Sequence, residues 1–237
     1  SDKPGKILVK VATSFTSIDN ARKNLAAEIP GWNFNEVRQA SSDIWNQALG
    51  QIAVKGNNEK EKVKFYSALY NAHFLPRAFS DVDGSYPRFD GDGQIMKMDH
   101  GTYYCDFSQW DTYRAVHPLF SILTPSRNGD MAHSLVLKGQ QGGWLPIFPS
   151  WNSYTAAMIG DHCIAMIGDA IVKDTPGFDY EEAYTLMRKN AFEANPDSGS
   201  YRDGKGRRAM ESYLKYNYVP LEDQVTEAFH RLSLIHI

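Results

Sequence analysis

The sequence has few cysteines, no long hydrophobic run and no large excess of charge of one sign. Its two cysteines, Cys105 and Cys163, lie in different segments without a CxxC neighbour, so neither a zinc site nor a redox motif is indicated, and one disulfide is possible but not required. No apolar run reaches the roughly 18 to 20 residues of a membrane span, and the chain does not open with a signal peptide. The net charge of -3 argues against a nucleic-acid or anionic-membrane surface.

Aromatic residues are plentiful. They make up 13% of the 237 residues, with 13 Tyr and 5 Trp, and many neighbour Asp, Asn or Gly. That mixture is typical of sites that bind sugar rings, although helix-rich cores use Tyr and Trp as well. A hydrophobic content of 42% excludes a disordered chain, and the length suits one large domain or two small ones.

The pattern of apolar residues predicts one strand followed by helices. Residues 6–15 are β-branched and partly alternating, which predicts a strand; because one strand cannot satisfy its own edges, we expect residues 1–18 to be the last strand of a β domain. Residues 92–104 are predicted as a short hairpin or extended loop. Helical periodicity or helix boundary signals then predict helices over residues 21–28, 33–51, 59–75, 110–123, 128–138, 154–173, about 180–194, and 207–216.

Consecutive amphipathic helices suit a bundle, a solenoid or an α/α toroid. No repeat of fixed period is present, which disfavours the solenoid. In a toroid long loops converge on one end, where a ligand can bind.

Two loops need separate comment. Asp81, Asp83 and Gly84 resemble part of a calcium loop, but the run lacks the regular oxygen ligands and terminal Glu of an EF-hand, so a turn is the favoured interpretation. Residues 139–146 are predicted as a flexible glycine-rich turn with an exposed Trp144, and their spacing matches neither a P-loop nor a Rossmann turn.

The strongest candidate site is Trp110, Asp111 and Arg114, which offer an apolar face, an acceptor for hydroxyl groups and a cation. If Asp111 begins a helix, Arg114 lies three residues on and can pair with it. A structural role for this set is equally compatible with the pattern, because Trp in helical proteins is often a core residue.

Asp161 and His162 lie on an otherwise apolar predicted helix. They are either a site facing a funnel or a buried pair hydrogen-bonded to its neighbours. Asp169 is near the same face and could equally lie on the surface, and His117, which precedes Pro118, is favoured as a structural residue.

Several motifs, in this order, resemble glycoside hydrolase family 92, the α-mannosidases, over about residues 6–230. The resemblance rests on Glu28-Ile-Pro-Gly-Trp32, Phe65-Tyr-Ser-Ala-Leu-Tyr-Asn-Ala-His-Phe74, Ser80-Asp-Val-Asp-Gly-Ser-Tyr86, Trp110-Asp-Thr-Tyr-Arg-Ala-Val-His-Pro118, Gly142-Gly-Trp-Leu-Pro146, Met158-Ile-Gly-Asp-His162, Gly177-Phe-Asp179 and Tyr213-Leu-Lys-Tyr-Asn-Tyr-Val-Pro220.

The resemblance implies a mainly α fold: an incomplete (α/α)6 toroid preceded by the last strand of an N-terminal β-sandwich. The implied boundaries are 1–18 for the end of the sandwich, 19–52 for connecting helices, 53–231 for the partial catalytic domain and 232–237 for a non-native tail. The implied activity is removal of terminal α-linked mannose from glycans by calcium-assisted inverting hydrolysis, in the periplasm or outside the cell.

The resemblance also implies roles for residues. Asp111, beside Trp110, matches the family's mannose-binding carboxylate, and Arg114, Asp161 and His162 match positions near the pocket; Trp144 is added as a substrate-binding candidate. The general acid and base are expected beyond Ile237, with most calcium ligands, so this truncated fragment is expected to be inactive. Another α/α-toroid glycosidase and a non-catalytic carbohydrate-binding or scaffold module remain open alternatives.

Overall fold

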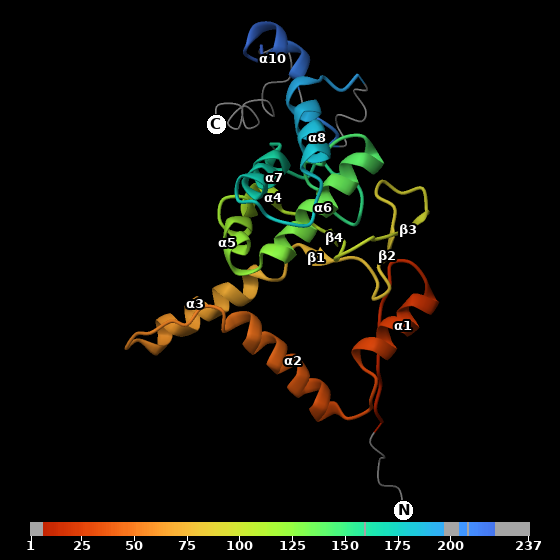
Figure 1. The fold of residues 1–237 in the computed structure, drawn as a ribbon, viewed down its shortest axis with the longest axis vertical. Coiled ribbons are helices and arrows are strands. Elements are labelled where there is room, and N and C mark those ends of the chain that lie inside the picture. Colours follow the sequence, from red (N-terminus) through yellow and green to blue (C-terminus); the bar gives the residue numbers. More distant parts are fainter. Residues whose placement is uncertain (1–6, 159, 197–203, 208, 221–237) are drawn as a thin grey trace, which may run out of the picture.

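The structure of the chain, a computed structural model, describes residues 7–158, 160–196, 204–207 and 209–220. Within these residues the fold is mainly helical, as predicted (Figure 1). The helices are α1 Ile18–Glu28, α2 Phe34–Leu49, α3 Glu59–Ala72, α4 Gln109–Thr112, α5 Val116–Leu123, α6 Pro125–Gly142, α7 His162–Val172, α8 Tyr180–Phe192 and α10 Met210–Tyr216.

Side-chain caps fix where several helices begin. Ser17, Asn58 and Asp179 each accept a hydrogen bond from backbone N–H groups in the first turn of α1, α3 and α8 respectively. Those N–H groups have no partner inside the helix, so a cap oxygen stabilises the helix start. These helices begin at or within a few residues of their predicted starts because such caps are local.

Four short strands form two antiparallel pairs. β1 (Arg77–Ala78) pairs with β4 (Tyr104–Cys105), and β2 (Ser85–Pro87) pairs with β3 (Ile95–Lys97). The extended character predicted for residues 92–104 is confirmed, but the hairpin has its other strand upstream, in β2.

The body of the molecule is built around α6. In Figure 1, α4, α5 and α7 lie on one side of α6 and the strands on the other, with α8 and α10 further towards the top. Gly129 of α6 lies so close to the loop before α8 that a Cβ there would come within 1.8 Å of the Pro176 carbonyl oxygen. The main core cluster joins β4, α5, α6, α7 and α8. Its residues are Tyr104, Phe107, Phe120, Met131, Leu135, Val136, Leu145, Cys163, Met166, Ile167, Ala183 and Leu186.

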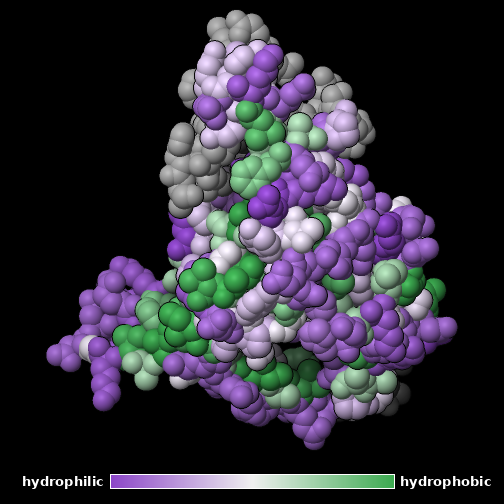
Figure 2. Space-filling model, turned by 45° about the horizontal axis from the view of Figure 1, so that its top comes forward, coloured by the Kyte–Doolittle hydropathy of each residue, from purple (hydrophilic) through white to green (hydrophobic). Residues whose placement is uncertain are grey.

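α2 and α3 project away from this body (Figure 1). α2 contains no buried residue, and Leu69 is the buried residue of α3. Figure 2 shows hydrophobic side chains at the base of the projecting arm and hydrophilic ones at its tip. The apolar faces predicted for both helices are therefore largely open to solvent.

The predicted strand over residues 6–15 is not present in the described part of this segment. Residues 7–16 have no regular secondary structure and pair with no strand among the described residues. The alternating pattern remains visible, since Ile7, Val9 and Val11 are 86%, 77% and 73% exposed. A strand needs a partner to satisfy its backbone groups, and none is supplied here. The tail over 232–237 lies outside the described residues.

Three predicted helices have different bounds. The helix over 110–123 is two helices, α4 and α5, because in a continuous helix Pro118 would clash with the carbonyl of Arg114; starting α5 at Val116 puts Pro118 in a first turn. The predicted glycine-rich turn is instead the end of α6, which continues to Gly142. α7 begins at His162 rather than residue 154, since Gly160 has the left-handed φ of 82°.

Candidate functional site

α4 is a single turn that presents Asp111 to solvent. Ser108 precedes this turn, and its hydroxyl donates a hydrogen bond to the Asp111 carboxylate. Asp111 is exposed, whereas the neighbouring Trp110 is half-buried. The turn therefore offers an oriented, accessible carboxylate next in sequence to a half-buried indole ring.

Arg114 does not pair with Asp111 within the described residues, contrary to the predicted ion pair. Its Nη1 donates to the Trp110 carbonyl oxygen at 2.8 Å. The guanidinium lies over the Trp110 ring, 4.9 Å from its centroid, and over the Tyr113 ring at 4.6 Å. α4 ends at Thr112, so the helical spacing that would place Arg114 beside Asp111 is lost. Cation–π contacts hold the arginine instead.

His162, at the start of α7, contacts the aromatic residues of the segment around α4. Its ring stacks on Tyr113, with centroids 4.5 Å apart and an angle of 20°, and meets the edge of Trp110 at 6.4 Å. His162 is 2% exposed. Gly160 makes room for it, because a Cβ there would lie 2.5 Å from His162 Nε2. Trp110, Tyr113, Arg114 and His162 thus form one cluster, which we call the aromatic cluster, with Asp111 at its exposed rim.

Asp161 belongs to a different network although it adjoins His162. It is 4% exposed, and its Oδ2 accepts hydrogen bonds from Arg207 Nε at 3.0 Å and Asn190 Nδ2 at 3.3 Å. Asn190 also exchanges two hydrogen bonds with the backbone of Leu145. The structure thus favours the buried, hydrogen-bonded alternative for Asp161, where it ties α7 to α8 and to residues 204–207.

Trp144 is buried, so the prediction of an exposed Trp144 is wrong. Its side chain is 8% exposed and packs with Phe89 and Tyr154, while Lys189 Nζ lies 4.5 Å from its ring centroid. The Tyr154 hydroxyl donates to the Trp144 carbonyl at 2.5 Å. Gly142 is the last residue of α6 and Gly143 is its left-handed C-cap, so these glycines end a helix instead of forming a flexible turn.

The remaining histidine and aspartate candidates lie in the core or on the surface, outside the aromatic cluster. His117 is 1% exposed, and burial lowers its pKa to about 4. This burial agrees with the structural role favoured for it. Asp169 forms an ion pair with Lys173 at 2.8 Å, with side-chain exposures of 30% and 36%, which is the surface alternative. Both cysteines are buried and unpaired as a disulfide, so the optional disulfide is absent.

One arrangement gave no signal in the sequence. Trp151 is 70% exposed, with Arg77 stacked 4.6 Å from its ring centroid. Asp106 accepts hydrogen bonds from Arg77 Nε and, at 2.7 Å, from the Trp151 backbone N–H. Trp151 and Asp106 both have positive φ, 52° and 61°. These three residues are far apart in the chain, and only the fold brings them together.

The described residues do not fit a calcium site. Asp81 is surrounded by hydrogen-bond donors: its oxygens accept from Ser14, Thr16, Asn20 and Asn24. Asp83 pairs with Lys23 at 2.8 Å and accepts from the Ser85 backbone, so the loop is a turn, as favoured. Calcium takes six to eight oxygen ligands, and the one described group of three metal-ligating side chains contains two histidines.

Comparison with known proteins places this geometry in context. The model of the glycosyl hydrolase family 92 catalytic domain matches residues 20–233. A family GH92 α-mannosidase from Bacteroides thetaiotaomicron superimposes with a TM-score of 0.79 and 33% identity, covering 92% of this chain and 28% of that one. A family GH92 inverting mannosidase from the same organism gives a TM-score of 0.78 and 28% identity, covering 87% and 27%.

A curated relative is similar along most of the sequence. It is an uncharacterized secreted glycosidase of Arthroderma benhamiae, 26% identical over 228 residues, which are 94% of this chain and 24% of that protein. This chain therefore spans about a quarter of the length of the relatives it matches.

Proposed function

This chain belongs to glycosyl hydrolase family 92, and on that premise we propose that the whole protein removes terminal α-linked mannose from glycans. The observation that carries the proposal is the oriented, exposed Asp111 at the rim of the aromatic cluster, within the matched span. A similar structure, the Bacteroides thetaiotaomicron α-mannosidase, is also known in complex with mannoimidazole. That complex supports a mannose-containing substrate for the whole protein.

We assign binding, rather than proton transfer, to the residues of this chain. Asp111 accepts hydrogen bonds from sugar hydroxyls, and the neighbouring half-buried Trp110, over which Arg114 lies, offers the remaining exposed part of its apolar ring. Arg114 and His162 hold Trp110 and Tyr113 in place through cation–π and stacking contacts. The cluster therefore positions the carboxylate relative to the sugar.

The proposed reaction is inverting hydrolysis. It requires a carboxylic acid that protonates the leaving oxygen and a carboxylate that activates water, roughly 6.5 to 9.5 Å apart. The name of one similar structure, an inverting mannosidase, supports this choice. We assign neither role to a described residue and expect both beyond Ile237.

Calcium, the (α/α)6 toroid and an extracytoplasmic location are further parts of the proposal. Bound calcium would contact sugar hydroxyls as a Lewis acid; the described residues do not fit it, and none of the residue roles given above depends on it. The helical pairs around α6 are compatible with part of a toroid. The secreted relative supports a periplasmic or extracellular site of action, and no helix among the described residues has the length and apolarity to cross a membrane.

Mannose release by the whole protein tests the proposal. Purified whole protein should release mannose from an α-linked mannobiose, and NMR should detect the β-anomer first if the reaction inverts. Asp111→Ala should lower kcat/KM about 100-fold, the equivalent of about 3 kcal/mol of lost charged hydrogen bonds. Asp92→Ala, which removes another exposed carboxylate, is the matched control and should leave kcat/KM unchanged.

Three results would contradict parts of this proposal. Glycan binding without hydrolysis would favour a non-catalytic carbohydrate-binding module. Near-normal kinetics of Asp111→Ala would remove Asp111 from the substrate site. Full activity after chelation of divalent cations would exclude a role for calcium, and turnover by the 237-residue chain alone would show that the acid and base lie within it.

A further inference from the structure

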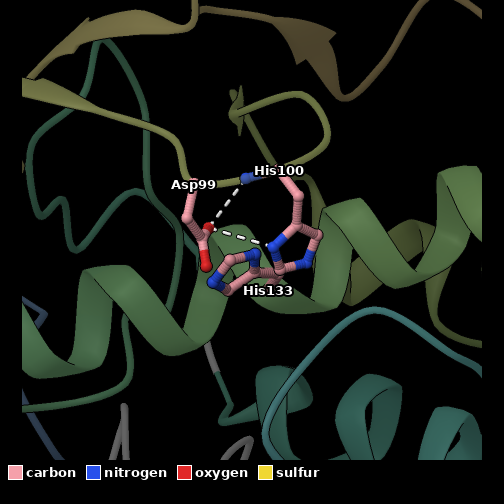
Figure 3. Close-up of side chains that lie close together, drawn as sticks. All are labelled: Asp99, His100 and His133. Carbon is pink, nitrogen blue, oxygen red and sulfur yellow. Dashed lines mark hydrogen bonds and ion pairs between the residues drawn. The ribbon is translucent and has the colours of Figure 1, made fainter.

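Three metal-ligating side chains meet on the surface, away from the core. Asp99 and His100 follow β3, and His133 belongs to α6. One ligand atom of each lies within 4.8 Å of the other two. Figure 3 shows the Asp99 carboxylate and the His100 ring turned towards each other, with the His133 ring rising from α6 beside them.

The contacts of His100 leave its Nδ1 facing the Asp99 carboxylate. Its Nε2 lies 3.0 Å from the Gly177 carbonyl oxygen, which can only accept a hydrogen bond, so the N–H is on Nε2. Nδ1 lies 3.0 Å from the Asp99 carboxylate. A neutral imidazole has one N–H and cannot donate to both. A proton or a metal cation must therefore lie between Nδ1 and the carboxylate.

His133 favours the metal cation. Its ring is stacked beside that of His100, with centroids 4.8 Å apart and an angle of 17°, so the exposed His100 ring must turn out of this stack before both rings can direct a nitrogen at one ion. Its Nδ1 is buried, and no described residue hydrogen-bonds it. A proton shared by Asp99 and His100 leaves that nitrogen unsatisfied, whereas a metal ion that binds His133 through Nδ1 satisfies it.

We propose that Asp99, His100 and His133 bind Zn²⁺ or a similar divalent transition-metal ion. Two imidazole nitrogens and one carboxylate oxygen are typical zinc ligands, whereas calcium requires oxygen ligands. Zinc ligands in a tetrahedral site lie roughly 3.3 Å apart. The Asp99–His100 pair already has that spacing, and the exposure of both side chains, 75% and 51%, lets them close on His133. Water takes the fourth position.

The proposed site connects three segments of the chain. It connects the loop after β3 to α6, and the Gly177 carbonyl, which orients His100, lies in the loop before α8. That carbonyl is the outer partner that metal-bound histidines usually have. The site is separate from the proposed sugar site and does not depend on it.

Titration with Zn²⁺ alone, followed by calorimetry, tests the proposal on the metal-free chain. We expect one ion per chain with at least micromolar affinity, and a visible tetrahedral d–d absorption when Co²⁺ replaces Zn²⁺. Asp99→Asn, His100→Gln and His133→Gln should each weaken binding at least tenfold. The matched controls are Asp92→Asn and His73→Gln, which change another exposed aspartate and another half-buried histidine and should bind as the wild type does.

A second measurement needs no variant. Diethyl pyrocarbonate should modify the exposed His100 of the metal-free chain, as mapped by mass spectrometry, and Zn²⁺ should suppress this at least fivefold until a chelator is added. Absence of Zn²⁺ binding, or binding that His133→Gln leaves unchanged with His100 unprotected, would overturn the proposal.

Discussion

At the scale of single residues, adjacent side chains serve different networks. Asp161 points to Arg207 and Asn190, whereas His162 stacks on Tyr113. Asp161 is the N-cap of α7 and His162 is its first residue. The sequence predicts one shared role for these two residues. In the structure Asp161 forms a buried ion pair with Arg207, and His162 makes an aromatic contact with Tyr113.

Asp161→Asn should therefore destabilise the chain strongly. It leaves the Arg207 guanidinium, 14% exposed, without its counter-charge, at a cost of about 3 kcal/mol. The free energy of unfolding from urea titration measures this loss. Asp169→Asn breaks an exposed ion pair with Lys173 and should cost less than about 1 kcal/mol. Equal losses in the two variants would contradict the assignment of Asp161 as a buried anchor.

At the scale of elements, α5 carries a buried histidine that resists protonation. Burial lowers the pKa of His117 to about 4, against the smaller opposing effects of Asn128 and of the Asp169 charge. In the unfolded chain the ordinary value of about 6.5 applies. Between these two values the unfolded state binds more protons, so stability falls as pH falls from 6.5 towards 4.

Hydrogen exchange of α5 should record this dependence. Between pH 7.5 and pH 5, after correction for intrinsic exchange rates, the free energy of opening α5 should fall by about 2 kcal/mol. His117→Gln cannot be protonated in this range, so its own change over the same interval should be smaller by that amount. An identical fall in both proteins would assign the pH dependence to other groups.

At the scale of the whole molecule, α2 exposes the apolar face that its sequence predicts. Phe34 and Ile44 are 67% and 66% exposed, and Val63 of α3 is 65% exposed. Burying apolar surface of this kind against another protein surface contributes a stabilisation of roughly 25 cal/mol per Å² buried. The exposed apolar faces of α2 and α3 therefore favour association of the chain.

We expect the chain to self-associate as its concentration rises. Ile44→Lys should weaken that association at least tenfold, since burying one isoleucine contributes about 1.5 to 3 kcal/mol. Sedimentation equilibrium measures the change, and Gln47→Lys adds the same charge at an exposed polar position of α2 as a control. A wild-type chain that stays monomeric at all concentrations would contradict this expectation.

The sequence by itself determined the features that depend on near neighbours. The caps Ser17, Asn58 and Asp179 and the helices behind them were predictable because capping and 3.6-residue periodicity act within a few residues. The family was recognisable from ordered motifs, which survive as local sequence. The candidate site was located for the same reason, since Trp110, Asp111 and Arg114 lie within one short stretch.

Only the tertiary structure decided what depends on distant neighbours. Burial of Trp144, the Asp161–Arg207 ion pair, the stacking of Tyr113 on His162 and the approach of His133 to Asp99 and His100 all join segments far apart in the chain. Periodicity carries no information on which segments meet, because packing selects among many partners of equal local propensity. The physical reason is that a side chain's burial and charge environment are properties of the whole fold.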